Sequence, residues 1–145
     1  MTTDLPPDPA ISPPRVLFVC AHNAGRSGIA VALAAHRAAG RIEVDSAGTT
    51  PDREPSATAI GTLAELGIDG TGHRPKAVTA ERVAAADVVV AMKPGLDLPQ
   101  VPGVRYETWS LPDPAEWDTE GIRPLREEID RRVQALIAEL TGEQP

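Results

Sequence analysis

The sequence is poor in the residues that mark several classes of protein. Its one cysteine, Cys20, has no partner for an internal disulfide, so we predict a reducing, cytoplasmic setting. Lysine and arginine number 14 against 21 acidic residues, and the net charge of -7 argues against nucleic acid or an anionic membrane as a partner. Aromatic residues make up only 3%, so aliphatic side chains must fill the core.

The sequence also lacks a segment that would direct it into a membrane or a secretory route. Its N-terminus has no basic start followed by an apolar stretch, and no apolar run approaches the length of a membrane span. Residues 1–14 are rich in proline and polar groups, and we predict a disordered leader there. The remaining chain shows no shift in composition, which predicts one domain over residues 15–142.

Apolar patterning along that domain predicts alternating strands and helices. Short runs rich in β-branched residues predict strands at 16–19, 41–45, 87–92 and 104–109. Helical spacing predicts helices over 27–39, from the N-cap Ser56 to Gly67, within 78–87, and over a final apolar stripe from 125 to 140. Such alternation predicts an α/β fold, with a parallel sheet covered by helices on both sides.

The segment CAHNAGRS, residues 20–27, lies between the first predicted strand and the first predicted helix. Backbone N–H groups in such a loop can surround a tetrahedral oxyanion, and the helix dipole adds partial positive charge. Gly25 permits a tight turn, and the Arg26 guanidinium can donate two parallel hydrogen bonds. The same positive field favours a thiolate at Cys20. The predicted oxyanion-binding residues are Ala21, His22, Asn23, Ala24, Gly25, Arg26 and Ser27.

Other polar residues complete the predicted site. Asp113, in the proline-flanked segment LPDPAEW, is positioned to act as a general acid, although an aspartate before proline also occurs in ordinary turns. Asn23 and Ser27 are expected to orient the loop, with Ser46 supporting them from the next strand. The three histidines lack metal-ligand spacing with one another and with the cysteine, so no metal site is predicted.

The order of these motifs resembles a known family. A cysteine, five residues, an arginine and a serine look like the phosphate loop of the low-molecular-weight protein tyrosine phosphatases and the arsenate reductases that share their fold. DSAGT from Asp45, ADVVVAM from Ala86 and LPDP from Leu111 resemble the later blocks of that family. The resemblance implies a four-stranded parallel sheet flanked by helices, with Cys20 as nucleophile, Arg26 as oxyanion clamp and Asp113 as general acid.

Within the family, HNAGRS and PGVRYETWSLPDP are more similar to the arsenate reductases. Thioredoxin-coupled members carry two further cysteines after the third strand, where this chain has Pro94 and Leu98. The chain therefore resembles the single-cysteine arsenate-mycothiol transferases. That resemblance implies no tightly bound cofactor, an external thiol such as mycothiol as co-substrate, and a small redoxin acting on the product.

Two alternatives remain open at this point. Arsenate and phosphate have nearly the same shape and charge, so the loop also suits a tyrosine phosphatase that hydrolyses phosphomonoesters through a phosphocysteine. Phosphotyrosine pockets tend to have aromatic walls, for which only Trp109 and Trp117 are available near the acid. A non-catalytic oxyanion-binding module is the third reading, which the intact Cys20, Arg26 and Asp113 disfavour.

Overall fold

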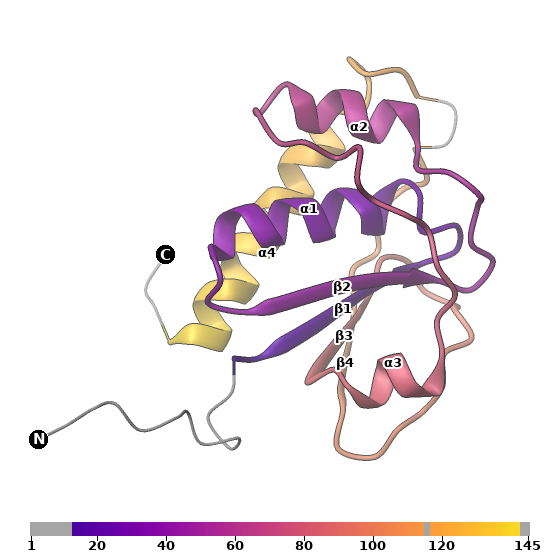
Figure 1. Cartoon of the computed structure of the whole chain (residues 1–145), viewed down its shortest axis with the longest axis vertical. Helices are drawn as coiled ribbons and strands as arrows, with labels where there is room; N and C mark the ends of the chain where they lie inside the picture. Colours follow the sequence, from indigo (N-terminus) through magenta and orange to yellow (C-terminus); the bar gives the residue numbers. More distant parts are fainter. Residues whose placement is uncertain (1–12, 115–116, 143–145) are drawn as a thin grey trace, which may run out of the picture.

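The computed structural model describes residues 13–114 and 117–142, and it shows an α/β fold built on one parallel sheet (Figure 1). The strands are β1 (Arg15–Cys20), β2 (Glu43–Gly48), β3 (Val88–Ala91) and β4 (Arg105–Thr108), in the spatial order β2-β1-β3-β4. All three pairings are parallel, so the carboxyl ends of the strands share one edge of the sheet. The predicted fold class is confirmed.

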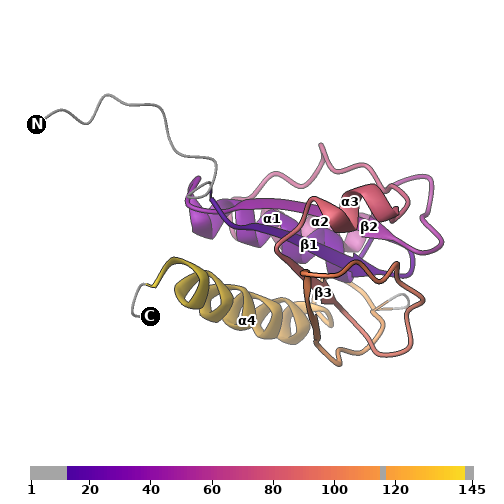
Figure 2. The same cartoon turned by 90° about the horizontal axis from the view of Figure 1, so that it is seen from below.

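Helices cover both faces of this sheet. They are α1 (Arg26–Ala38), α2 (Ala57–Ala64), α3 (Ala80–Ala84) and α4 (Arg123–Thr141). The long helices α1 and α4 lie on one face together with α2, whereas the short α3 covers the other (Figures 1 and 2). This placement follows from the right-handed crossovers that parallel strands require.

The central strand β1 explains why the core divides into two clusters. Phe18 faces α1 and α4, packing with Ile29 and Ile129, and its ring lies 5.9 Å from that of Trp109. Leu17 points to the opposite face, towards Val83 of α3. Successive side chains of a strand point to opposite faces, so a continuous apolar run is what a strand buried on both sides needs.

The second strand differs from its prediction at both ends. We predicted a strand over 41–45, followed by a loop, but β2 begins at Glu43 and continues to Gly48. Arg41 closes the end of α1 instead, since its N–H donates to the carbonyl of Ala38 over 3.0 Å. Pairing with β1 then extends to Cys20 opposite Gly48, because the central strand offers hydrogen-bonding groups along its whole length.

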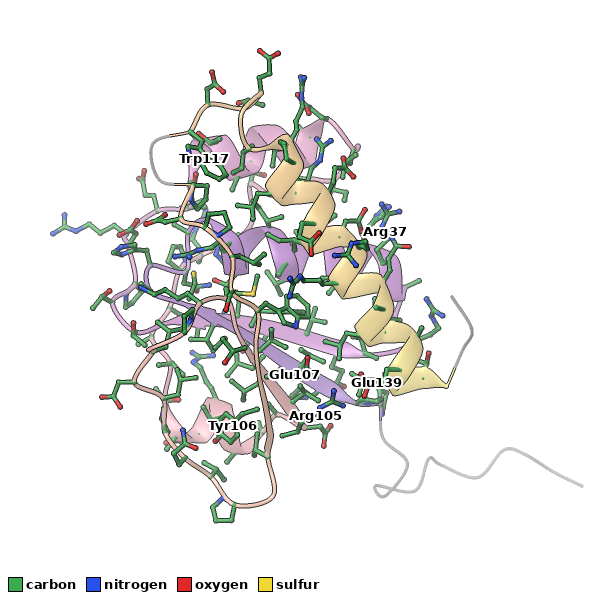
Figure 3. All side chains as sticks on the ribbon, turned by 180° about the vertical axis from the view of Figure 1, so that it is seen from behind. Arg37, Arg105, Tyr106, Glu107, Trp117 and Glu139 are labelled. Carbon is green, nitrogen blue, oxygen red and sulfur yellow. The ribbon has the colours of Figure 1, made fainter. Side chains whose placement is uncertain are left out.

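Charged pairs fasten α4 to the rest of the domain. Asp130 accepts two hydrogen bonds from the Arg37 guanidinium of α1, at 2.9 and 2.7 Å. Arg105 of β4 donates to Glu139 near the end of the same helix, and Figure 3 shows the two side chains next to each other. Charged pairs therefore join the helix that carries the predicted apolar stripe to α1 and to β4.

The predicted leader falls mostly outside the described residues, which begin at residue 13. The carbonyl of Pro14 accepts a hydrogen bond of 2.8 Å from the N–H of Glu43, next to the first residue pair of the sheet. The division into a leader over 1–14 and a domain over 15–142 stays a prediction. Within residues 13–114 and 117–142, every helix is too short or too polar to cross a bilayer.

Candidate active site

A cleft of about 210 Å³ opens at the carboxyl ends of the strands. The last residue of β1, Cys20, lies in it, and the connection after β2 contributes Asp52 and Glu54. The segment after β4 adds Asp113 and Pro114. Ligands of open parallel sheets bind at this edge, so the topology itself brings these distant segments together.

The sulfur of Cys20 lies at the floor of the cleft, and the residue is 2% exposed. The N–H of Asn23 donates to it over 3.2 Å, and the Ser27 hydroxyl oxygen lies 2.9 Å from it. That hydroxyl also accepts a 2.8 Å hydrogen bond from the Asn23 side-chain amide, so its own proton is available to the sulfur. These two contacts hold the sulfur in a fixed position below the loop.

The loop between β1 and α1 is shaped to bind an anion. Helix α1 begins at Arg26, and its N-cap residue Gly25 makes no side-chain capping bond. The first-turn N–H groups of a helix have no partner within the helix, which leaves them for an anion at this end. Asn23 adopts the left-handed conformation with a φ of 54°, and this residue turns the loop back over the sulfur.

Arg26 is buried beside the cysteine and lines the same cleft. Its Nη1 donates to the carbonyl oxygen of Leu111 over 3.0 Å. A guanidinium has five N–H donors, so this bond fixes its orientation and leaves donors for a ligand. Because Leu111 lies two residues before Asp113, the same bond ties the acid-bearing segment to the loop.

Asp113 lies at the mouth of the cleft, where its side chain is exposed. Prolines flank it on both sides, and Pro114 is buried against the loop near Gly25. The fixed φ of proline limits the conformations of this segment. The structure therefore brings the three predicted catalytic residues, Cys20, Arg26 and Asp113, into one cleft.

His73 is a site residue that the sequence analysis did not identify. Its Nε2 lies 2.6 Å from the carbonyl oxygen of Asn23 and donates to it. The N–H of Lys76 donates to the Asn23 side-chain oxygen over 2.9 Å. The segment from His73 to Lys76 thus braces the loop from behind, fifty residues along the chain. No local spacing signals such a contact, because it depends on how the crossover after α2 returns to the sheet.

Gly48 is the other residue whose role only the structure reveals. A methyl group there would lie 2.5 Å from the carbonyl oxygen of Ala21 and 3.0 Å from the N–H nitrogen of Asn23. Any side chain would therefore push the loop out of position. The N–H of the next residue, Thr49, donates to the carbonyl of Cys20 over 3.2 Å, so the end of β2 holds the loop in place.

Some predicted residues lie near the cleft without lining it. His22, Ala24 and Gly25 line its wall, whereas Asn23 and Ser27 are wholly buried behind the loop. The carbonyl of Ala21 turns away to accept a hydrogen bond from Thr50. The Ser46 hydroxyl, predicted to support the loop, is buried and makes no hydrogen bond within the described ranges.

The two tryptophans do not form walls for the cleft. Trp109 is 6% exposed and packs in the core against Phe18. Trp117 is 37% exposed on the segment that leads to α4 and is not among the lining residues (Figure 3). In the described part of the chain, the cleft is lined by carboxylates, prolines and small residues, with His22 as its one ring of aromatic character.

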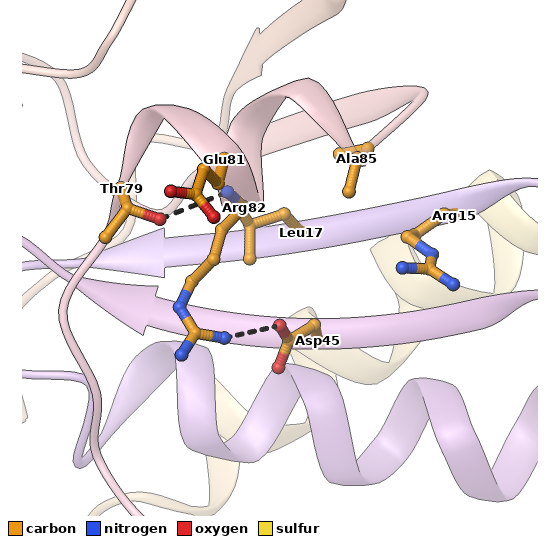
Figure 4. Close-up of a pocket in the computed structure, with 8 residues that line it drawn as sticks. Arg15, Leu17, Asp45, Thr79, Glu81, Arg82 and Ala85 are labelled. Carbon is orange, nitrogen blue, oxygen red and sulfur yellow. Dashed lines mark hydrogen bonds and ion pairs between the residues drawn. The ribbon is translucent and has the colours of Figure 1, made fainter.

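A larger hollow of about 460 Å³ lies beside α3, on the face of the sheet that this helix covers (Figure 4). Arg82 there pairs with Asp45, and the Arg15 guanidinium pairs with Glu43 of the neighbouring strand. Its floor includes Leu17 and Ala86. It contains no nucleophile, and its cations are already paired, so the smaller cleft around Cys20 is the candidate active site.

Comparisons with known proteins show which proteins the chain is similar to. The sequence profile of the low molecular weight phosphotyrosine protein phosphatase family matches residues 15–97. The glutaredoxin arsenate reductase of Synechocystis sp. is 34% identical over 130 residues, which span 88% of this chain and 98% of that protein. A solved structure titled "An arsenate reductase in the phosphate binding state" superposes with a TM-score of 0.77 at 34% identity, covering 88% of this chain and 98% of the other.

A further structural relative is longer than this chain. The thioredoxin-dependent arsenate reductase of Corynebacterium glutamicum superposes with a TM-score of 0.80 at 37% identity. The match covers 93% of this chain but 65% of that one, so this chain spans less than two thirds of its length.

Proposed function

The chain belongs to the low-molecular-weight phosphotyrosine protein phosphatase family, as its motifs predicted, and from this premise we propose that it is an arsenate reductase that transfers arsenate to an external thiol. The observation that carries the proposal is one cysteine at the floor of a cleft shared with Arg26 and Asp113. Relatives named as arsenate reductases support the choice of oxyanion.

Arsenate binds first, in the loop over the sulfur. The first-turn N–H groups of α1, which have no partner within the helix, surround its oxygens, and Arg26 donates to two of them. The charge of the guanidinium offsets that of the anion next to the thiolate, which would otherwise repel it. The hydrogen bond from Arg26 to Leu111 keeps the guanidinium in the plane that this contact requires.

The sulfur of Cys20 then attacks arsenic. An S–As bond forms while one As–O bond breaks, and Asp113 supplies the proton with which that oxygen leaves as water. Ser27 and Asn23 hold the sulfur by hydrogen bonds from behind, so it faces the bound anion. Arsenic remains pentavalent in this step, because no electrons are exchanged.

An external thiol completes the transfer. Its sulfur attacks the arsenic, the bond to Cys20 breaks, and Cys20 leaves as the thiolate that begins the next cycle. The product is a thiol–arsenate adduct in which arsenic is still pentavalent. A redoxin thiol then attacks the thiol sulfur of that adduct, so the S–As electron pair reduces arsenic to arsenite and a mixed disulfide forms.

This route follows from the absence of a second cysteine in the sequence. An internal disulfide relay needs further thiols, and by the resemblance described above the segment that would carry them holds Pro94 and Leu98 instead. The glutaredoxin and thioredoxin in the relatives' names support a redoxin as the final reductant. A thiol of the mycothiol type is the co-substrate we propose.

A phosphatase reaction is the second candidate, and the family membership favours it. Cys20 would form a phosphocysteine, with Asp113 protonating the leaving alcohol and then activating water. The walls of the cleft argue against phosphotyrosine as the substrate, because neither Trp109 nor Trp117 lines it. Among the described residues, a bound phenyl ring would have Pro55 and Pro114 to pack on and no tryptophan to stack against.

Two assays in parallel distinguish these functions. Purified protein is incubated with arsenate, mycothiol and its redoxin, and separately with a phenyl phosphate ester. Arsenite in the first assay alone supports the reductase, and ester hydrolysis alone supports the phosphatase. Tight phosphate binding with neither activity indicates a non-catalytic module. Replacing Asp113→Asn slows either reaction strongly while phosphate binding remains.

A further inference from the structure

The charge of the cleft mouth differs from that of its floor. The floor carries the guanidinium of Arg26, which is buried, whereas the mouth carries the carboxylates of Asp52, Glu54 and Asp113. The floor is suited to an oxyanion. The mouth presents negative charge to whatever approaches that anion from solvent.

The rim carboxylates Asp52 and Glu54 are compensated little by neighbours. Both are exposed, as is Arg53 between them, which does not line the cleft. Within the ranges 13–114 and 117–142, neither Glu54 nor Arg53 forms a side-chain hydrogen bond or ion pair, so this cation is not paired with either carboxylate. Asp52 pairs with His22, whose Nδ1 lies 3.5 Å from its Oδ1 and 3.2 Å from the carbonyl of Thr50. The rim therefore keeps most of its negative charge.

Any external thiol has to pass this rim. The chain has one cysteine, which lines this cleft together with the two carboxylates and Asp113, so a thiol that reaches arsenic on Cys20 through the cleft passes these groups. A thiol with a positive or zero net charge approaches the carboxylates more easily. A negative charge on the thiol raises the free energy of the encounter and of the transition state.

We propose that Asp52 and Glu54 determine the class of co-substrate by charge, so the enzyme accepts a thiol without net negative charge and discriminates against an anionic one such as glutathione. This proposal rests on the proposed function, because it names the thiol that attacks the arsenic held on Cys20. In that step the new S–As bond forms as the bond to Cys20 breaks, and the rim acts only on the incoming molecule.

The test compares two thiols that differ in charge and not in their reacting group. Glutathione carries a net negative charge, and its diethyl ester carries a net positive one. We expect arsenate-dependent kcat/KM, normalised for the thiolate fraction of each thiol, to favour the ester by about fivefold at low salt, from two exposed charges acting through water. At about 1 M salt, where the Debye length is about 3 Å, the preference should largely vanish.

Charge-neutral variants locate the effect. The double variant Asp52→Asn/Glu54→Gln should reduce the preference to about one, by an increased rate with glutathione. The matched control Glu81→Gln/Asp97→Asn removes the same net charge from exposed positions outside the cleft, and it should keep the wild-type preference. An unchanged preference in the rim variant, or an equal loss in the control, overturns the proposal.

A second readout works without arsenate and separates the two proposals. The 2-pyridyl mixed disulfides of the same two thiols react directly with Cys20, and release of pyridine-2-thione reports the rate. Without a bound oxyanion the Arg26 guanidinium also acts on the anionic disulfide, so here the rim is tested by the variants: Asp52→Asn/Glu54→Gln should raise the rate with the glutathione disulfide relative to the ester disulfide, and the control should not. If arsenate turnover fails with every thiol while this shift is found, the proposed function is wrong and charge selection at the rim stands. If the shift is absent here, the rim inference is wrong whatever the turnover.

Discussion

The hydroxyl oxygen of Ser27 lies 2.9 Å from the sulfur of Cys20. Since the side chain of Asn23 donates to that oxygen, the hydroxyl proton is left to point to the sulfur. We predict that Ser27→Ala slows alkylation of Cys20 by iodoacetamide in mildly acidic buffer by about ten- to hundredfold, as loss of one hydrogen bond to a charged group implies. Mass spectrometry of the modified protein measures this rate.

Ser46 provides the matched control for that variant. It is also a buried serine near the loop, but its hydroxyl makes no hydrogen bond within the described residues. Removing an unsatisfied buried hydroxyl costs little and can stabilise a protein. We therefore expect Ser46→Ala to leave the alkylation rate and the urea midpoint close to those of the wild type. A loss as large as that of Ser27→Ala would assign Ser46 the supporting role that its sequence position suggested.

Gly48 tests whether the end of β2 fixes the loop. A methyl group at this position meets the carbonyl oxygen of Ala21 and the nitrogen of Asn23, both in the backbone. Gly48→Ala should weaken phosphate binding at least tenfold and lower the free energy of unfolding by about 1–3 kcal/mol. In the control Gly72→Ala, the added methyl meets nothing within 4 Å, and both quantities should stay near the wild type. Isothermal titration with phosphate and urea unfolding give the two values.

Asn23 combines a backbone role with a side-chain role, and two substitutions separate them. Asn23→Gly removes the side-chain bonds to Ser27 and Lys76 but accepts the positive φ of 54°. Asn23→Ala removes the same bonds and also places a side chain at a positive φ, which costs about 1–2 kcal/mol more. We expect urea unfolding to rank the stabilities as wild type, Gly and then Ala. Equal stability of the two variants would show that the loop does not hold this conformation in solution.

A pH dependence follows from the ion pairs that join α2 to α4. The hydrogen bonds from Arg123 and then Arg126 lower the pKa of Glu65 from its ordinary value of 4.5 to about 2. A carboxyl whose pKa is lower in the folded state adds stability that is complete above about pH 4.5 and is lost as the pH falls towards 2. Urea unfolding should give the wild type a higher free energy of unfolding than Glu65→Gln at pH 7. The difference between the two free energies should shrink below pH 4.5. A constant difference over this range contradicts the pairing.

The sequence predicted those features of the fold and site that depend on local pattern. The buried run of β1, the cap at Ser56 and the apolar stripe of α4 are local signals, and each was found where its residues indicated. The cysteine loop was also recognisable, because its residues are consecutive. The start of β2 was predicted wrongly, since Arg41 has the spacing of a strand residue but hydrogen bonds to the end of α1.

The residues that brace the loop were beyond local pattern. His73 contacts Asn23 across fifty positions, and the need for glycine at position 48 arises only where β2 passes behind the loop. Trp109 illustrates the converse, because its place near the predicted acid suggested a pocket wall, whereas its ring packs on Phe18 in the core. Which face of a segment is turned to a site depends on packing that a single sequence does not show.

The most direct measurement of the account is formation of the thiol–arsenate adduct without any redoxin. Wild-type protein is mixed with arsenate and mycothiol, and the adduct is followed by mass spectrometry beside Cys20→Ser. We predict that the adduct accumulates at a rate proportional to the concentration of wild-type enzyme. With the variant, it should form no faster than in the absence of enzyme. Adduct formation by Cys20→Ser at the wild-type rate would contradict the claim that this sulfur carries the arsenate.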